Sequence, residues 1–427
     1  MSNSEYKYDV AVIGAGPAGL AAALAAKKEG AEKVVLIERD FRPGGILEQC
    51  VHTGFGLKYF GEELSGPEYA YRFIKKCEDK RIEMMLNTMA LNIDGANRVI
   101  HAVNQNGAVQ IKAGAIVLSM GCRERTRAQI VIPGSRPAGI YTAGTAQRFC
   151  NVQNHIVGRE IVIVGSGDIG MIMARRMTLE GAKVKAVVEV MPYLAGLTRN
   201  RVQCLDDFGI PLYLSHTVVN IEGKRRVNRV TVAKVDEGRQ PIKGTEFDID
   251  CDTVLLSVGL IPENEVSKSA GVELDPVTKG PLVDQNMMTR TPGIFACGNV
   301  VHVNDLVDNV STESEIAGDS AAKFAKGTLK GADNEISVKP GTLVRYMVPR
   351  FIEAGGVERE TKMYFRVTEP AKNVTIEAKN GEETLYHSRK KFVNPGEIEH
   401  IQIAADQLNR LKGGDIVVNV IKDEEAR

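Results

Sequence analysis

The chain contains 427 residues, and its formal charges balance at 54 basic and 54 acidic side chains. This balance gives no support to nucleic acid or an acidic membrane surface as a partner. The length predicts about two or three domains, since a typical domain has roughly 100–200 residues. Seven cysteines, an odd number without any Cys-x-x-Cys pair, argue against a secreted disulfide framework and a cysteine-rich metal site.

The N-terminal residues contain no apolar core of the kind that a secretion signal needs. The longest uncharged run, residues 10–26, is broken by three glycines and a proline and is too short for a membrane span. We therefore expect a cytoplasmic protein without a transmembrane segment.

Residues 8–38 predict a strand, a glycine-rich turn, a helix and a second strand. The expected bounds are 8–13, 14–19, 20–28 and 33–37, and Glu38 follows directly. In the turn, Gly14 permits the tight bend, Gly16 lets the backbone approach a pyrophosphate, and Gly19 lets helix and strand pack closely. The start of the helix offers free N–H groups to phosphates, and Glu38 can accept hydrogen bonds from ribose hydroxyls. This pattern predicts a dinucleotide site.

The next segment is expected to extend the same domain. Its predicted elements are a helix over 67–80, a strand region over 82–93, hairpin strands over 99–105 and 108–113, and a buried strand over 115–118. The hairpin follows from the Asn-Gly pair at 106–107. The paired glycines at 44–45 indicate backbone that passes close to a ligand. Residues 122–157 are expected to form a connector.

The opening pattern recurs after the connector. A strand over 160–164, a turn over 165–170, a helix over 171–180 and a strand over 183–188 are expected. Glu189 follows Gly165 after 24 residues, the same interval as from Gly14 to Glu38. A second nucleotide site is therefore predicted. Because a carboxylate accepts from a free 2′-hydroxyl and repels a 2′-phosphate, Glu189 favours NAD(H) over NADP(H).

The remaining residues predict more strands than helices. We expect a hairpin over 230–235 and 246–249, a buried strand over 253–257, a short strand within 291–299 and a helix over 312–328. Residues 332–340 are interpreted as a linker. Short β-like runs beyond it, at 342–347, 362–367, 374–378, 397–403 and 415–421, predict a separate small β-sandwich.

Residues 8–330 resemble the two-dinucleotide flavoprotein oxidoreductases related to glutathione and thioredoxin reductases. The resemblance rests on the two glycine motifs, on Ser119-Met120-Gly121 and Ser257-Val258-Gly259, and on the run 295–299. It implies an α/β fold with two nested Rossmann-like domains, for FAD and NAD, and the C-terminal β-sandwich domain is added to them. The expected domains are 1–122 with 262–335 for FAD, 123–261 for NAD(H), and 336–427.

The motifs and the resemblance together predict two sets of cofactor-binding residues, but no catalytic residue and no metal ligand. For FAD they are Gly14, Gly16, Pro17, Ala18, Gly19, Glu38, Arg39, Gly45, Ala90, Gly121, Gly298 and Asn299. For NAD(H) they are Gly165, Gly167, Asp168, Ile169, Gly170, Glu189 and Gly259. The family usually has aspartate where Asn299 stands, and an amide oxygen can still accept a hydrogen bond.

The chain lacks the redox-active cysteine pairs of the disulfide reductases, which disfavours dithiol–disulfide chemistry. Residues 121–125 and 132–144 instead resemble the NADH-linked flavoprotein subunits of glycerol-3-phosphate, opine and amine dehydrogenase complexes. That likeness implies hydride exchange between NAD(H) and FAD, a partner that is a second dehydrogenase subunit, and a small-molecule substrate. Two alternatives stay open: a stand-alone NADH oxidase or peroxidase that uses Cys50, and a non-catalytic nucleotide-binding scaffold subunit.

Other candidates have a structural reading that competes with the functional one. Cys50 is interpreted as a packing thiol, and His52 as a hydrogen-bonded structural histidine. Arg123 and Arg125 are compatible with a pyrophosphate or substrate contact and also with a solvated connector. The basic run 224–226 is interpreted as a solvated turn.

Overall fold

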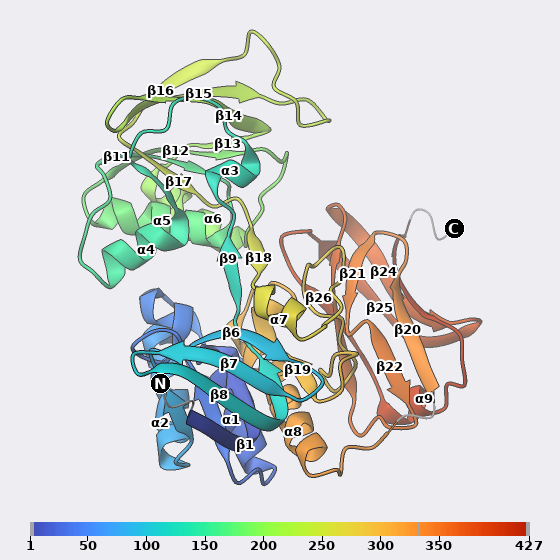
Figure 1. Cartoon of the computed structure of the whole chain (residues 1–427). Coiled ribbons are helices and arrows are strands. Elements are labelled where there is room, and N and C mark those ends of the chain that lie inside the picture. Colours follow the sequence, from blue (N-terminus) through green and yellow to red (C-terminus); the bar gives the residue numbers. More distant parts are fainter. Residues whose placement is uncertain (1–3, 332–333, 424–427) are drawn as a thin grey trace. The chain divides into compact units, whose positions relative to one another are not determined.

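The structure, a computed structural model, describes residues 4–331 and 334–423 and divides the chain into two compact units (Figure 1). Unit 1 joins Met1–Cys122 to Pro262–Arg427, and unit 2 is Arg123–Ile261. Unit 1 contains a nucleotide-type α/β domain and a C-terminal domain rich in strands, each with its own cluster of buried apolar side chains.

The α/β domain of unit 1 is built on a seven-stranded sheet in the order β5-β2-β1-β8-β7-β6, with β19 beside β8. Strands β5, β2, β1, β8 and β19 are parallel, whereas β8, β7 and β6 form an antiparallel meander. The strands are β1 (Ser4–Ile13), β2 (Val34–Ile37), β5 (Glu83–Met85), β6 (Met89–Asp94), β7 (Val99–Asn104), β8 (Gly107–Leu118) and β19 (Ile294–Ala296).

Helices α1 (Pro17–Lys28) and α8 (Val307–Ala325) pack closely against one another in this domain. A Cβ atom on Gly318 of α8 would overlap the carbonyl of Ala22 on α1. Alanines make α1 narrow, and residues 18–23 are all buried. Pro17 fits the first turn of α1 because the missing N–H has no partner there. Other elements of unit 1 are η1 (Gly45–Gln49), β3 (Thr53–Phe55), β4 (Leu64–Ser65), α2 (Gly66–Asp79), α7 (Glu265–Ser269) and η3 (Gly298–Val300).

Unit 2 repeats the strand–helix–strand arrangement on a five-stranded parallel sheet in the order β10-β17-β11-β12-β13. An antiparallel sheet, β14-β15-β16, completes the unit, and it includes the predicted hairpin. The strands are β10 (Ile140–Thr142), β11 (Glu160–Val164), β12 (Lys183–Glu189), β13 (Leu212–Leu214), β14 (His216–Gly223), β15 (Val227–Lys234), β16 (Phe247–Asp250) and β17 (Thr253–Leu256).

The predicted connector over 122–157 is wrong in part, because this segment contains regular elements of unit 2. Besides β10 it includes α3 (Arg127–Ile130) and α4 (Ala143–Asn151), while β9 (Cys122–Glu124) pairs with β18 (Leu260–Pro262). The proline and glycine signals lie between these elements. The helices that complete unit 2 are α5 (Asp168–Leu179), α6 (Thr198–Cys204) and η2 (Asp206–Phe208).

The C-terminal domain contains two sheets, in the orders β22-β20-β27-β24-β25 and β21-β23-β26. Its elements are β20 (Asn334–Pro340), β21 (Val344–Val348), β22 (Phe351–Ala354), β23 (Thr361–Val367), β24 (Ala371–Asn380), β25 (Glu383–Val393), β26 (Glu399–Ile403), α9 (Ala405–Asn409) and β27 (Ile416–Lys422).

The linker expected over 332–340 is wrong for residues 334–340, while 332–333 lie outside the described residues. Residues 334–340 form β20, which pairs with β22 and β27. Ile336 and Val338 are buried and alternate with polar neighbours, which is the period of a strand with one buried face. Other bounds also differ. Residues 82–93 form two strands, 107–118 is one continuous strand through Gly114, and helices α1, α5 and α8 begin earlier than expected, at Pro17, Asp168 and Val307.

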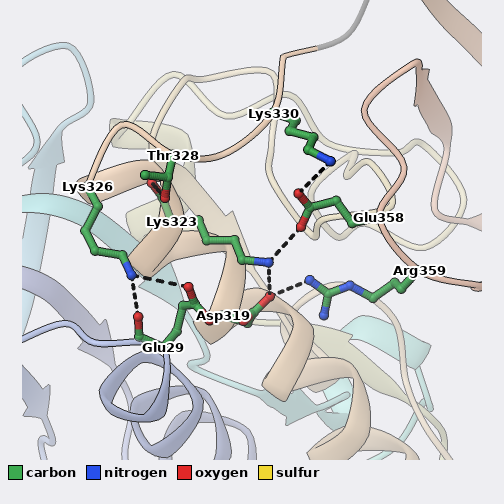
Figure 2. A network of polar contacts seen from close by, with 8 residues as sticks. All are labelled: Glu29, Asp319, Lys323, Lys326, Thr328, Lys330, Glu358 and Arg359. Carbon is green, nitrogen blue, oxygen red and sulfur yellow. Dashed lines mark hydrogen bonds and ion pairs between the residues drawn. The ribbon is translucent and has the colours of Figure 1, made fainter.

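The C-terminal domain is attached to the α/β domain by ion pairs (Figure 2). The Asp319 carboxylate on α8 accepts from Arg359 and Lys323, and the same lysine lies 2.7 Å from Glu358. Burial alone would raise the pKa of Asp319, but Arg359 and Lys323 hold it below its ordinary value. Tyr346, from β21, belongs to the apolar core of the α/β domain, so packing reinforces the ion pairs.

A buried carboxyl in unit 1 leads to a prediction about stability. Asp284 is fully buried, and its Oδ1 accepts from the N–H groups of Asn286 and Met288 at 2.8 Å each. Oδ2 has no hydrogen-bond partner in the described part of the chain. Burial, reinforced by Glu353, raises the pKa of Asp284 to about 8. The folded chain therefore holds a proton there that the unfolded chain releases near pH 4, at roughly the ordinary pKa of an aspartate.

Stability from this proton is complete below the unfolded pKa and is lost as the pH rises toward 8, by at most about 1.4 kcal/mol per pH unit. We expect Asp284→Asn, which keeps the Oδ1 acceptor, to flatten the decline in urea unfolding midpoint between pH 5 and about 8. Asp236→Asn is the control, because exposed Asp236 makes a similar turn contact to Gln240 N at 2.8 Å. If the unfolding midpoint declined with pH equally steeply in both variants, the proton would not be on Asp284.

Candidate functional site

The first glycine turn joins β1 to α1, and its glycines meet different surroundings. Gly14 has a φ of +102°, and a Cβ there would lie 2.6 Å from the Ser119 carbonyl oxygen. A Cβ on Gly19 would overlap the carbonyl of Gly14. The packing of the chain itself therefore requires both glycines. Gly16 differs, because a Cβ there would meet only the Gly45 Cα, at 4.0 Å. Packing of the described chain therefore leaves room for a Cβ at Gly16, unlike at Gly14 and Gly19.

Glu38 lies at the end of β2 and is bound to this turn. Its Oε2 accepts from Ala15 N at 2.7 Å, and its Oε1 accepts from Asp40 N at 2.8 Å. The Glu38 carbonyl also accepts from Thr88 N at 2.8 Å, so the segment that leads to Ala90 passes beside the acid. Arg39 is exposed. The buried Glu38 carboxylate is therefore held beside the first glycine turn. Its oxygens keep further lone pairs that can accept hydrogen bonds.

Segments distant in sequence complete the surroundings of the first turn. Gly44 N donates to Ala15 O at 2.8 Å, and a Cβ on Gly45 would lie 2.9 Å from the Gly16 Cα. A Cβ on Gly298 would lie 2.8 Å from the Cβ of Ala18 at the start of α1. The structure thus gathers these predicted residues around one turn.

Gly121 and Asn299 lie in the same unit as this turn. Gly121 has a φ of +72°, and its carbonyl accepts from Glu263 N at 3.0 Å. No atom lies within 4 Å of a Cβ on Gly121, so packing in the described chain does not require a glycine there, although the positive φ favours one. Asn299 Oδ1 accepts from Asn304 N at 3.0 Å, and its amide lies 3.7 Å from Cys122 Sγ.

A buried acid on α8 fixes the turn at Gly298, and sequence reasoning missed it. Glu313 Oε1 accepts from Gly298 N at 2.7 Å, and Oε2 lies 2.9 Å from Nε2 of His302. His302 and Glu313 are 1% and 2% exposed, so water does not compete for this contact. The only signal in the sequence is a weak one, an acid among the small residues of a predicted helix.

The second glycine turn joins β11 to α5 in unit 2. Gly165 has a φ of +95°, and a Cβ there would overlap the Ser257 carbonyl. Ser257 Oγ accepts from Gly170 N at 3.0 Å and would lie 3.1 Å from a Cβ on Gly167. Gly259 has a φ of +101°, and the nearest atom to its Cβ position is Arg125 Cδ at 3.8 Å. The turn is therefore packed on the Ser257 side.

Glu189, at the end of β12, repeats the contacts of Glu38. Its Oε2 accepts from the N–H and the hydroxyl of Ser166, both at 2.8 Å, and its Oε1 accepts from Met191 N at 2.9 Å. Glu189 is 4% exposed. The predicted interval of 24 residues thus corresponds to a defined geometry in both units, a carboxylate bound to the backbone of the glycine turn.

Asp168 and Ile169 begin α5, and the acid has structural partners. Asp168 Oδ1 accepts from Leu197 N at 2.8 Å and from the side-chain amide of Asn200 at 2.7 Å. These contacts fix the segment that leads into α6. Ile169 packs against the apolar core of unit 2.

The other candidates have mainly structural surroundings. Cys50 Sγ donates to Ile46 O at 3.3 Å, and burial raises the pKa of its thiol to about 12. His52 contacts Thr53 O at 3.0 Å through Nδ1. The solvated turn expected over 224–226 is wrong for Arg226, whose guanidinium donates to Asp252 O at 2.7 Å. The backbone offers this carbonyl from a distant segment, which sequence reasoning did not foresee.

Two features are absent from the described residues. No group of three or more histidine, cysteine, aspartate or glutamate side chains there is arranged to hold a metal ion. No helix in that part of the chain is long and apolar enough to cross a membrane.

Comparison with known proteins gives consistent matches. The family model described as pyridine nucleotide-disulphide oxidoreductase matches residues 8–321. An opine oxidase subunit from Agrobacterium tumefaciens is 25% identical over 359 residues, covering 77% of this chain and 67% of that protein. Thioredoxin reductase of Bacillus subtilis is 26% identical over 303 residues, covering 70% of this chain and 88% of that protein.

The fold has a counterpart among solved structures. The crystal structure of T. acidophilum thioredoxin reductase matches with a TM-score of 0.62 and 23% identity, covering 76% of this chain and 99% of that one. This likeness confirms the predicted α/β fold class, with two dinucleotide-type domains. The sheet-rich C-terminal domain stands in addition to them.

Proposed function

This chain belongs to the pyridine nucleotide-disulphide oxidoreductase family, and from that premise we propose that it exchanges a hydride between NAD(H) and FAD. The family implies FAD and a pyridine nucleotide. The observation that supports the proposal is the pair of glycine turns, each with a buried carboxylate bound to its backbone. When bound, FAD supplies the two-electron chemistry, so the protein has to bind, orient and shield it.

The first turn fits a dinucleotide because packing leaves it open at the required place. The side of Gly16 is unobstructed, and α1 begins at the next residue, so backbone N–H groups are available to a pyrophosphate. We assign Glu38 to the ribose hydroxyls of FAD. Gly45, Gly298 and their neighbours would enclose the same ligand.

We assign the second turn, in unit 2, to NAD(H). Glu189 is buried beside Ser166 and already accepts backbone hydrogen bonds on both oxygens. A carboxylate in this position accepts from a free 2′-hydroxyl and repels a 2′-phosphate, which supports the preference for NAD(H) over NADP(H).

The proposal extends to a role within a complex. A relative that matches 77% of this chain is named as a subunit of opine oxidase. We infer that this chain is likewise the flavoprotein subunit of a multi-subunit dehydrogenase of the glycerol-3-phosphate, opine or amine type. A second dehydrogenase subunit would then act on the small-molecule substrate, and electrons would pass between NAD(H) and that second protein through this chain.

The Cys50 peroxidase alternative receives less support. A reactive cysteine needs a lowered pKa, whereas burial raises the pKa of Cys50 to about 12. Under our proposal, Cys50→Ser leaves NADH oxidation unchanged. The scaffold alternative differs in a measurable way, because a scaffold would bind nucleotide without turnover.

Anaerobic addition of NADH to the purified, flavin-loaded chain tests the function. We expect rapid bleaching of the flavin absorption near about 450 nm, and much slower bleaching by NADPH. Bound flavin that neither nucleotide reduces would overturn hydride exchange by the isolated chain and favour the scaffold. Equal rates with both nucleotides would keep the exchange but remove the preference.

A further inference from the structure

Three basic side chains gather in unit 1 where the C-terminal domain meets the start of α8, and no role assigned above uses them. Lys58 comes from the loop after β3, Lys362 from β23 and His400 from β26. We call these three residues the basic cluster. Neither lysine forms an ion pair within 4.0 Å in the part of the chain that the structure describes.

Lys362 is the inner member of the basic cluster. Its ammonium lies 3.4 Å from Asn309 Oδ1 and 4.9 Å from the centre of the Tyr364 ring. Desolvation, and then the charge of Lys58, lower the pKa of Lys362. Glu313 attracts Lys362 through space, but its two oxygens are bound to Gly298 and His302. The half-buried ammonium of Lys362 thus contacts one amide oxygen and one aromatic ring, and no carboxylate lies within ion-pair distance of it in the described part of the chain.

Lys58 and His400 complete the cluster. The backbone N–H of Lys58 donates to Asp308 Oδ2 at 2.8 Å, so both lysines are attached to neighbouring positions on the first turn of α8. His400 faces Tyr364 across two antiparallel strands, with ring centres 6.1 Å apart. Desolvation and the nearby lysines lower the pKa of His400 to about 4, so its ring is neutral near pH 7.

Two other cations of the same domain are each paired with an acid. Lys390, on β25, forms an ion pair with Glu399. Arg366, on β23, is paired with Asp305 in the same way. Lys58 and Lys362 differ from these two cations, because neither lysine forms such an ion pair in the described part of the chain.

We propose that Lys58 and Lys362, with Asn309 and His400 beside them, bind the carboxylate or phosphate group of a small molecule. The charge of Lys58 disfavours the charged form of Lys362, which is half-buried, so an oxyanion bound beside both lysines would offset the repulsion and the burial. Lysine ammonium groups bind such groups through charge and donated hydrogen bonds. Because Lys362 is half-buried whereas Lys58 is exposed, we place a small group there and not a macromolecule.

The place of the basic cluster connects it with the redox site. Asn309 lies one helical turn before Glu313, which accepts from Gly298 N beside the first glycine turn. We therefore assign the anion to the small-molecule substrate, which this chain would hold by its anionic group while the second subunit acts on it, and this assignment of substrate class rests on the proposed function. The binding of the anion itself does not.

The test is a calorimetric titration of the flavin-loaded full-length chain with inorganic phosphate and, separately, with acetate at constant ionic strength. We expect saturable binding of one of them, which identifies the anionic group. Lys362→Gln and Lys58→Gln should each weaken it about tenfold or more. Lys372→Gln is the matched control, since Lys372 is an exposed lysine on β24 of the same domain, and it should bind like the parent.

Thermal unfolding of each variant shows whether it is folded, and NADH bleaching reports separately on the proposed function. Saturable binding that both cluster variants weaken would support the site even if NADH bleached nothing. The site would be overturned by an absence of saturable binding to the parent, or by equal affinities in all variants. Binding of poly-glutamate without binding of either small anion would likewise overturn it, in favour of an acidic protein partner.

Discussion

Gly16→Ala is expected to remove most FAD binding while the chain stays folded. The new methyl group would meet only the Gly45 Cα at 4.0 Å, and the backbone at Gly16 has a φ of −75°, which alanine adopts freely. Alanine is a poorer N-cap than glycine, but it also stiffens the unfolded chain, and the two effects are each about 0.5–1 kcal/mol and opposite in sign. The methyl group would, however, occupy the space where we place the pyrophosphate.

We expect the FAD dissociation constant to rise on the order of 100-fold, equivalent to about 2.7 kcal/mol. Flavin fluorescence titration of the apo-protein measures this change, and thermal unfolding of the apo-protein measures the fold. Gly413→Ala is the control, because a Cβ on exposed Gly413 meets nothing within 4 Å. Gly19→Ala should behave differently, since its Cβ overlaps the Gly14 carbonyl and the fold itself is lost. Unchanged FAD affinity in the Gly16 variant would refute the placement of the ligand.

The two glycine turns were predictable because their determinants are local. A strand, three glycines at fixed spacing, a helix and an acid at the end of the next strand occur within about 30 residues, as in a βαβ unit. The positive φ of Gly14 and Gly165 and the contacts of Glu38 follow from that short segment. The conformation of each turn can therefore be predicted from its own short segment of sequence.

The rest of the site depends on contacts between distant segments. Gly298 meets Ala18 because α8 packs on α1, and no local pattern encodes that approach. Glu313 receives its role only when Gly298 and His302 are folded over it. The basic cluster likewise combines residues of the C-terminal domain with Lys58 of the α/β domain, so no local pattern in the sequence distinguishes its lysines.

The error at 334–340 has a related physical cause. The polar residues and the final proline of this segment are typical of a linker, while the alternation of Ile336 and Val338 offers only two buried positions. Pairing with β22 and β27 supplies the missing stabilisation. Because β27 follows near the end of the chain, the partner that makes 334–340 a strand cannot be recognised locally.

Glu189→Gln is expected to weaken the discrimination between NADH and NADPH. In the parent chain, Ser166 N and Met191 N donate to different oxygens of Glu189. Glutamine has only one side-chain oxygen, so one of these two hydrogen bonds is lost, at a cost of about 1 kcal/mol of stability. More important, the negative charge that would repel a 2′-phosphate is removed, and the amide can donate to that phosphate. The ratio of flavin reduction rates for NADH over NADPH should fall about tenfold or more, equivalent to about 1.4 kcal/mol.

Stopped-flow measurement of flavin reduction by NADH and by NADPH, at matched concentrations, gives the ratio of the two rates. A glutamate-to-glutamine change at the first glycine turn provides the comparison. Glu38→Gln alters an acid with equivalent contacts to Ala15 and Asp40, so it should weaken FAD and leave the nucleotide ratio unchanged. If Glu38→Gln changed the ratio and Glu189→Gln did not, the assignment of the two turns would have to be exchanged. If neither variant changed it, specificity would come from residues other than these two carboxylates, which are bound to the backbones of the glycine turns.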